Sequence, residues 1–163
     1  MAARDAANSS AHIVHYMGLV DANSSGNVHG GTVLKLIDEA AGMAAMKHSR
    51  NRVVTAGMDR TTFLVPMSVG ELVSFAASVN AAWRTSMEVG VRVEAENPRT
   101  GDVRHTATAY LTMVALDEDG APTEVPPVVA DTREAERRMR EAEMRRANRL
   151  AEREEIMRRR GPH

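Results

Sequence analysis

The 163-residue sequence has no cysteine, which excludes disulfide bonds, thiolate metal sites and cysteine nucleophiles. Aromatic residues are scarce as well, with one tryptophan, two tyrosines and two phenylalanines. No apolar run approaches the roughly 18 residues that a membrane span requires. The first twelve residues, MAARDAANSSAH, lack the hydrophobic stretch of a secretory signal. We therefore expect a cytoplasmic protein with no membrane partner.

Neither sign of charge dominates, because 21 lysines and arginines face 22 acidic residues. This balance gives no reason to expect nucleic-acid or membrane-surface binding. The distribution is uneven, since residues 1–130 carry 10 basic and 14 acidic side chains, and residues 131–163 carry 11 arginines and 8 acids. Composition shifts after Pro126–Pro127, a pair that cannot continue a helix. The sequence thus predicts a disordered lead at 1–10, a folded domain at 11–130 and a charged helix at 131–163.

The apolar pattern of the folded domain predicts one long helix and five strands. A helical period of 3.6 residues runs from Thr32 to about His48. Strands are expected at residues 12–20, 51–63, 71–83, 85–96 and 103–117. The order is a strand, the helix and then four strands in an antiparallel meander. Because one helix cannot cover itself, it should lie across the concave face of the sheet in an α+β fold.

The stretch GNVHGGTVLKLID, at the start of the helix, is the first candidate site. The first amides of a helix have no acceptor within the helix, so they can stabilise an anionic oxygen, and Gly30 and Gly31 leave them open to a ligand. Two turns later Asp38 falls on the alanine-rich apolar face. Burial of an unpaired carboxylate raises its pKa, as suits a general base. The alternative is that the glycines only shape the turn, and that Asp38 is half-exposed or has a structural hydrogen bond.

The tail from Asp131 onward consists of strong helix formers with only a thin apolar stripe. Its acids and arginines recur four residues apart, at Glu134–Arg138, Glu136–Arg140, Glu141–Arg145, Glu154–Arg158 and Glu155–Arg159. These patterns predict a solvated helix packed loosely on the domain or on a neighbouring subunit. A nucleic-acid-binding arm is not expected, because acids alternate with the arginines and the tail has no aromatic residue.

Five segments resemble the hotdog-fold acyl-CoA thioesterases of the acyl-CoA hydrolase type, which include bacterial broad-range and brain-type enzymes. They are DANSSGNVHGGTVLKLIDEAAGMAAMKHS, VVTAGMD, FLVPMSVGELV, RTSMEVGVRVEAE and AYLTMVALDEDGAPTEVP. The resemblance spans about Val20 to Pro126 in the order and spacing of the family. It implies an α+β hotdog fold, in which an antiparallel sheet wraps a long central helix, with a C-terminal helical extension here. It also implies hydrolysis of acyl-CoA to a fatty acid and coenzyme A, in active sites shared by the two subunits of a homodimer, commonly within a trimer of dimers.

The resemblance assigns roles to particular residues. The family's catalytic acid falls on Asp38, as general base or nucleophile, and its catalytic asparagine falls on Asn23, supplied by the partner subunit. Amides at Gly30 and Gly31 would then stabilise the oxyanion. Coenzyme A is part of the substrate and product, and the chemistry needs neither a cofactor nor a metal.

Other candidates carry less specific signals. Thr55 and Ser86 match family segments that line the acyl and pantetheine channel or the adjoining interface, and Phe63 is a candidate lining residue of the acyl pocket. Each has an ordinary structural role as its alternative. His29, beside the helix start, is expected to form a structural hydrogen bond.

The phosphates of coenzyme A require cationic partners near the mouth of the channel. Arg60, Arg84 and Arg104 are the candidates, with a simple solvated charge as the alternative for each.

Two other functions stay open from the sequence. One is a non-catalytic acyl-CoA-binding or assembly domain, in which the tail helix recruits a partner. The other is a hotdog hydratase acting on enoyl-CoA, which normally uses an Asp/His pair just after the loop that precedes the helix. No such spacing is evident here, and the match at Asp38 and Asn23 favours the hydrolase.

Overall fold

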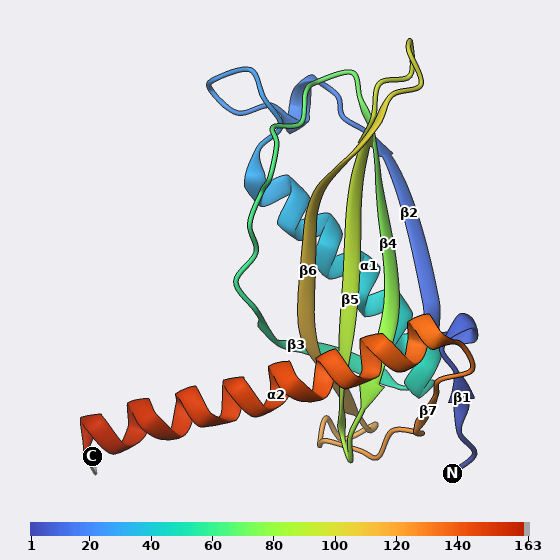
Figure 1. Ribbon diagram of the computed structural model, residues 1–163, viewed down its shortest axis with the longest axis vertical. Helices are drawn as coiled ribbons and strands as arrows, with labels where there is room; N and C mark the ends of the chain where they lie inside the picture. The colour runs from blue at the N-terminus through green and yellow to red at the C-terminus, as the bar shows by residue number, and fades with distance from the viewer. Residues whose placement is uncertain (162–163) are drawn as a thin grey trace.

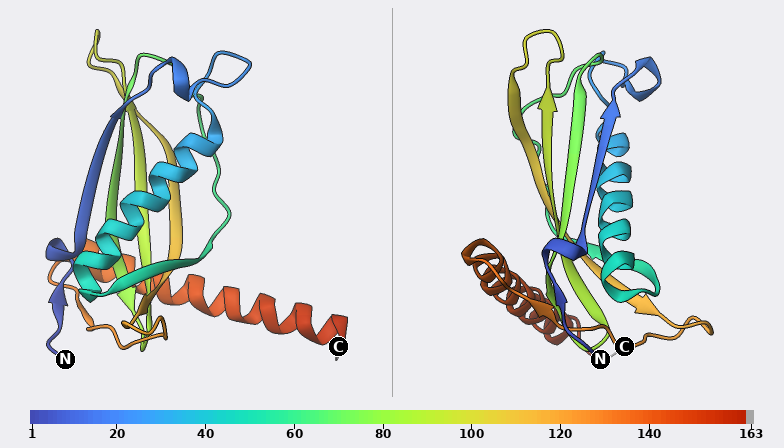
Figure 2. Two further views of the ribbon diagram at one scale, coloured as in Figure 1. Left: turned by 180° about the vertical axis from the view of Figure 1, so that it is seen from behind. Right: turned by 90° about the vertical axis from the view of Figure 1, so that its right-hand side faces the viewer.

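A curled five-stranded antiparallel sheet lies between two helices in the computed structural model, which describes residues 1–161. The long helix α1 (Gly30–Ser49) lies across one face of the sheet, and α2 (Arg133–Arg160) crosses the other (Figures 1 and 2). The strands are β2 (Ser10–Tyr16), β3 (Arg52–Met58), β4 (Leu72–Ala82), β5 (Ser86–Glu96) and β6 (Val103–Leu116). This arrangement confirms the predicted hotdog architecture with a C-terminal helical extension. Within the described residues, no helix is both long and apolar enough to cross a membrane.

The strand order is β2-β4-β5-β6-β3, so the predicted four-strand meander holds only for β4, β5 and β6. Strand β3 pairs antiparallel with β6, with Arg52 opposite Leu116, and lies at the far edge of the sheet. Helix α1 connects β2, at one edge of the sheet, to β3, at the other edge. The segment 59–71 then carries it back to β4. Sequence periodicity identified the strands but could not show that the helix spans the full width of the sheet.

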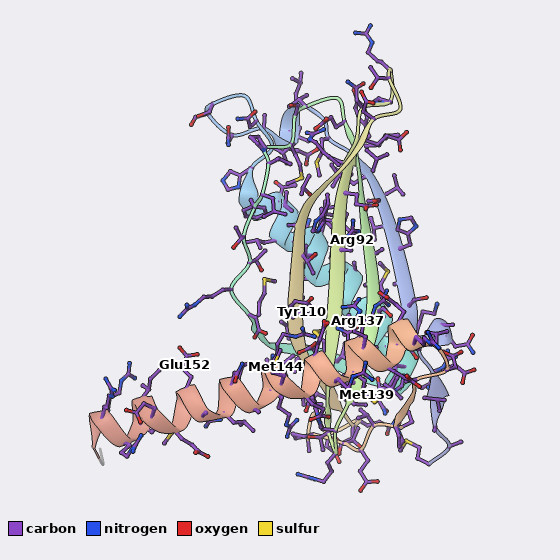
Figure 3. The ribbon with its side chains drawn as sticks, viewed as in Figure 1. Arg92, Tyr110, Arg137, Met139, Met144 and Glu152 are labelled. Carbon is purple, nitrogen blue, oxygen red and sulfur yellow. The ribbon has the colours of Figure 1, made fainter. Side chains whose placement is uncertain are left out.

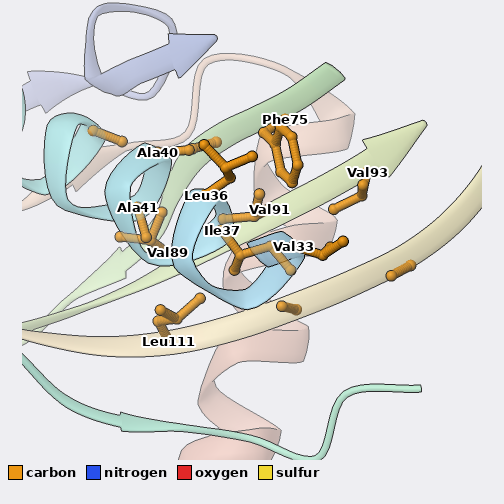
Figure 4. Close-up of a cluster of buried hydrophobic side chains, with 14 of the residues drawn as sticks. Val33, Leu36, Ile37, Ala40, Ala41, Phe75, Val89, Val91, Val93 and Leu111 are labelled. Atoms are coloured by element: carbon orange, nitrogen blue, oxygen red, sulfur yellow. The ribbon is translucent and has the colours of Figure 1, made fainter. Parts of the chain in front are cut away.

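The core lies between α1 and the concave face of the sheet (Figure 4). Alternate residues of β4 and β5 point toward the helix, and Phe75, Val89, Val91 and Val93 are all buried. The helix packs against them with a stripe of small and branched side chains, namely Val33, Leu36, Ile37, Ala40, Ala41 and Ala44. Alanines along this stripe let the helix axis approach the sheet closely.

The first ten residues are not the disordered lead that the sequence predicted. Strand β1 (Arg4–Asp5) pairs in parallel with β7 (Val128–Val129), and a short 3-10 helix, η1 (Ala7–Ser9), follows it. The Arg4 guanidinium donates to the backbone carbonyls of Lys47 and His48, which lie in the last turn of α1. A cation at a helix C-terminus satisfies carbonyls that have no partner in the helix, which gives this segment a fixed place.

Several predicted boundaries also shift. Strand β2 ends at Tyr16, and residues Leu19–Asp21 form a second 3-10 helix, η2. Helix α1 begins at Gly30, two residues before the predicted start. Strand β3 ends at Met58, five residues before the predicted end, because the segment 59–67 leaves the sheet. This segment becomes one wall of the candidate active site.

Helix α2 contacts the outer face of the sheet over its first half through a few side chains, and most of its residues are exposed. Ala135 and Ala142 are buried there, the Trp83 indole N–H donates to Glu143 (2.8 Å), and Tyr110 lies beside the helix (Figure 3). The second half, which carries Glu152, projects past the edge of the sheet. Three of the five predicted Glu–Arg pairs form ion pairs, at Glu134–Arg138, Glu141–Arg145 and Glu155–Arg159.

Candidate active site

Asp38 lies on the exposed side of α1, not in its buried stripe as predicted. It follows the fully buried Ile37 by one residue, which turns it about 100° round the helix and away from the sheet. Its Oδ1 atom accepts a hydrogen bond of 2.5 Å from the hydroxyl of Thr55 on β3. The carboxylate therefore stands beside the sheet edge, oriented by a neighbouring strand and open to solvent in the single chain.

Within residues 1–161, no further strand lies beyond β3 at that edge. Its middle residues, Val54 to Gly57, are exposed. The pairing with β6 shifts register between Thr55 and Gly57, which marks a β-bulge. Bulges re-aim side chains and are common beside active sites. Asp38 and Thr55 thus form a polar pair at an uncovered edge.

The start of α1 is capped by His29, whose Nδ1 atom accepts a hydrogen bond from the Gly31 amide (2.8 Å). This bond confirms the structural role predicted for His29. It also corrects the prediction for Gly31, because an amide already bonded to the cap is not free to stabilise an oxyanion. The amide of Gly30 has no such bond among the described residues, so it is the donor left at the helix start.

A hollow of about 300 Å³ opens beside this helix start. Asn23, Gly30 and Phe63 all line it, together with Asn27, Val28, Leu64, Val65, Pro66 and Met67. The Oδ1 atom of Asn23 accepts the amides of Ser25 (2.9 Å) and Asn27 (3.2 Å). These bonds hold the side chain in place and leave its NH₂ group as a donor. The hollow therefore has a largely apolar wall and two hydrogen-bond donors, the Asn23 NH₂ group and the Gly30 amide.

The loop that carries Asn23 is anchored by Asp21, a buried residue to which the sequence analysis gave no role. Its carboxylate accepts from the Gly18 amide (2.8 Å) and pairs with His15 (3.1 Å). Burial alone would raise the pKa of Asp21, but the Gly18 amide and His15 together lower it. The backbone carbonyl of Asp21 also accepts from the His29 amide (2.7 Å). Asp21 thus ties the Asn23 loop to the start of α1, a link between positions eight residues apart that periodicity does not reveal.

Within one chain, the two groups of candidate residues are too far apart to act on one carbonyl. Asp38 follows Gly30 by eight residues, which is about 12 Å along the helix axis. Asn23, Gly30 and Phe63 line the hollow, whereas Asp38 and Thr55 lie farther along the helix at the sheet edge. A site that uses both groups requires two chains.

The remaining candidates lie outside the hollow. Ser86 begins β5 and pairs with Val114, which in turn pairs with Val54 on β3. Arg84 is exposed, and its carbonyl accepts from the Val125 amide (3.0 Å). Arg60 is almost fully exposed and lies 3.7 Å from Glu152 of α2. None of the three contacts Asn23 or Asp38 in the single chain.

Arg104 has a structural role beside the hollow. It forms a bidentate ion pair with Glu71 (2.5 and 2.7 Å) and donates to the carbonyl of Pro66 (2.9 Å). The Arg104 hydrogen bonds lower the pKa of Glu71, and those of Glu71 raise the pKa of Arg104. The arginine thus fixes Pro66 in the wall of the hollow with three of its five N–H donors.

Known proteins resemble this chain in sequence and fold. Residues 25–101 match the thioesterase superfamily. The chain is 40% identical to Helicobacter pylori protein VdlD over 105 residues and spans 60% of that protein's length. It is 39% identical to the uncharacterized acyl-CoA thioester hydrolase YkhA of Bacillus subtilis over 115 residues, 71% of this chain and 67% of the relative. It is also 38% identical to the human cytosolic acyl coenzyme A thioester hydrolase, over 71% of this chain and 33% of the relative.

Two solved structures match this chain over nearly the whole length of both chains. An apo-hexameric acyl-CoA thioesterase superposes with a TM-score of 0.90 and 38% identity, covering 93% of this chain and 97% of its own. The Staphylococcus aureus acyl-CoA hydrolase, in complex with butyryl coenzyme A and coenzyme A, gives a TM-score of 0.87 at 33% identity, with 94% and 93% covered. The chain therefore belongs to the hotdog-fold acyl-CoA hydrolases of the thioesterase superfamily.

Proposed function

We propose that this protein hydrolyses acyl-CoA thioesters in active sites that two copies of the chain build together. Asp38 and Thr55 of one subunit would meet Asn23 and Gly30 of the partner subunit. The observation that carries this proposal is the Thr55–Asp38 hydrogen bond at the uncovered edge of β3. It supports a site that is half-built in one chain and is completed when a second sheet edge approaches.

Variants of the Staphylococcus aureus hydrolase support the choice of residues. Three of them carry alanine in place of an asparagine, an aspartate and a threonine. Along that chain the three positions are separated by 15 and then 17 residues. Asn23, Asp38 and Thr55 have the same two spacings here.

The proposed chemistry begins with a water held against Asp38. The carboxylate takes a proton from this water as the water oxygen forms a bond to the thioester carbonyl carbon. The carbonyl oxygen becomes anionic, and the Gly30 amide, helped by the positive end of α1, stabilises it. Collapse of this intermediate breaks the carbon–sulfur bond, and the thiolate receives the proton from Asp38. Direct attack by Asp38 on the carbonyl carbon, through an anhydride that water later hydrolyses, is the second route.

Thr55 and Asn23 would orient these reactants. The Thr55 hydroxyl occupies Oδ1 of Asp38 and leaves Oδ2 to face the water. Asn23, held by its own loop amides, can donate from its NH₂ group to the water or to the carbonyl. Phe63 would line the acyl end of the site. Every proposed step uses side chains and amides of this chain, with coenzyme A entering as part of the substrate.

We extend the proposal to assembly and location. A homodimer is the smallest unit that completes the site, and the hexameric neighbour supports a trimer of dimers. The human relative is named for the cytosol, which supports a cytoplasmic setting for the reaction.

Thiol release from a series of acyl-CoAs tests the proposed function. Asp38→Asn keeps the size of the side chain but removes its basicity, so we expect kcat to fall by roughly 10² to 10⁴, the usual contribution of a general base. Glu39→Gln, at the neighbouring exposed acid, is the matched control and should retain wild-type kcat. Tight acyl-CoA binding without turnover by the wild-type protein would instead identify a non-catalytic binding domain.

A further inference from the structure

Arg149, on α2, contacts carboxylates from two separate parts of the sheet. Its guanidinium lies 2.8 Å from Asp59, directly after β3, and 3.3 Å from Glu88 on β5. The Arg149 and Asp59 side chains are 28% and 24% exposed. This partial burial makes their ion pair stronger than one at an open surface.

Glu88 fixes α2 in one position on the outer face of the sheet. Its side chain is fully buried and accepts from Arg145 (2.6 Å) and from Asn80 (3.2 Å). Arg145 also stacks over the Tyr110 ring, 3.6 Å from its centroid. Removing one partner of a buried ion pair is strongly destabilising, so these contacts hold the helix in a single register. Arg149, one turn farther along, is therefore presented to Asp59 by a firmly placed helix.

Asp59 lies between the two parts of the candidate active site. Thr55, four residues earlier, holds the Asp38 carboxylate, and Phe63, four residues later, lines the hollow. The backbone amide of Asp59 donates to the backbone carbonyl of Tyr110 on β6 (2.9 Å), where β3 leaves the sheet.

Strand β3 has reason to need such an anchor. It is an edge strand whose one partner strand in the described part of the chain is β6, and a bulge follows Thr55 directly. An irregular edge strand has fewer backbone hydrogen bonds to fix it than a central strand, so side-chain contacts at its end determine its position.

We propose that Arg149 is a positioning residue for the Asp38–Thr55 pair. By holding Asp59, it fixes the end of β3 and the first residues of the segment that lines the hollow. Helix α2 thus sets the geometry of a site that it does not touch. This role rests on the proposed acyl-CoA hydrolysis, and it gives a function to the tail beyond Asp131, which the family motifs leave uncovered.

The test compares kcat and KM in the full-length protein, with the acyl-CoA that the wild type hydrolyses fastest. Asp59→Asn removes the charge that Arg149 holds but keeps the buried Glu88–Arg145 contact, so α2 should stay docked. We expect kcat to fall about tenfold with KM within about twofold, because small misplacement of catalytic groups slows chemistry more than binding. Arg149→Met should give the same loss, and Arg149→Lys should restore part of it. Arg153→Met, on the exposed part of α2, is the control and should match the wild type.

The double variant gives the decisive comparison. If Arg149 acts through Asp59, the combined variant should lose no more kcat than either single variant. A wild-type kcat for Asp59→Asn, or losses that multiply in the double variant, would overturn the positioning role while leaving the hydrolase proposal intact. A wild-type protein that hydrolyses no acyl-CoA would remove the proposed function, and the positioning role with it.

Discussion

The Thr55 hydroxyl donates to the Asp38 carboxylate across a distance of 2.5 Å, which joins an edge strand to the central helix. The two residues lie 17 positions apart, and each is exposed in the single chain. An exposed pair gains little stability from such a bond, because water competes for both groups. Its value is orientation, since it fixes which carboxylate oxygen is left for a reacting water.

Thr55→Ala should lower kcat by about ten- to a hundredfold, because a hydrogen bond to a charged group contributes about 1.5–3 kcal/mol and the alanine leaves Asp38 free to rotate. Thr55→Ser keeps the hydroxyl and should retain most of the activity. Steady-state assays of thiol release, with the melting temperature as a check on folding, make the measurement. Equal activity in the alanine and serine variants would show that the hydroxyl does not orient the base.

A mixture of two inactive variants should recover activity if the site is shared. Asn23→Ala and Asp38→Asn each inactivate every site in their own homodimer. After the subunits exchange, each mixed dimer has one site with Asp38 from one subunit and Asn23 from the other. An equal, random mixture should therefore reach about a quarter of wild-type activity, since half of the dimers are mixed and each has one intact site. Recovery that never exceeds the sum of the two variants would place both residues in a single chain.

The sequence predicted the helices and strands of this fold better than it predicted which of them lie side by side. The alternation in β4 and β5 and the helical period of α1 are local properties, and the structure confirms both. The edge position of β3 depends on how far α1 crosses the sheet, and no local pattern records that distance. The face of Asp38 was assigned wrongly for a similar reason. Alanines at 41 and 45 surround it on a helical wheel, but the sheet covers the side centred on Ile37.

Motifs and the family resemblance predicted the residues of the candidate site and its division between two subunits, but not all of the contacts that hold these residues in place. Asn23, Gly30 and Phe63 were each proposed from motifs, and the structure brings them to one hollow. The pairing of Arg104 with Glu71 was not predicted, because Glu71 lies 33 residues away in the sequence. The anchor formed by Arg149 and Asp59 joins residues 90 positions apart, so only the folded chain reveals it.

The two glycines at the start of α1 should respond differently to alanine. A Cβ atom at Gly30 would lie 3.6 Å from the Phe63 ring, an ordinary contact, whereas one at Gly31 would lie 3.0 Å from the His29 imidazole. Gly30→Ala should therefore keep the fold and lower kcat/KM by partly filling the hollow beside the free amide. Gly31→Ala should disturb the His29 cap and lower stability by about 1 kcal/mol, the usual value of an N-cap bond. Chemical denaturation and thiol-release assays on both variants check this division, and a loss of stability at Gly30 alone would reverse it.

Stability should fall as the pH drops below about 6.5, because His48 is buried without charge. Its Nδ1 and Nε2 atoms lie 2.6 Å from the Ser9 hydroxyl and 2.7 Å from the Pro126 carbonyl. Burial lowers the pKa of His48 below its ordinary value of 6.5, and the nearby Arg4 adds to the shift, although the Pro126 carbonyl opposes it. The unfolded chain therefore takes up the proton at a higher pH than the folded chain. The contribution is complete above pH 6.5 and declines as the pH falls toward the lowered pKa. Urea midpoints measured between pH 8 and pH 5 should show this decline, and His48→Gln, although less stable throughout, should show a flatter profile in that range. An equal slope in both proteins would assign the proton uptake to a different group.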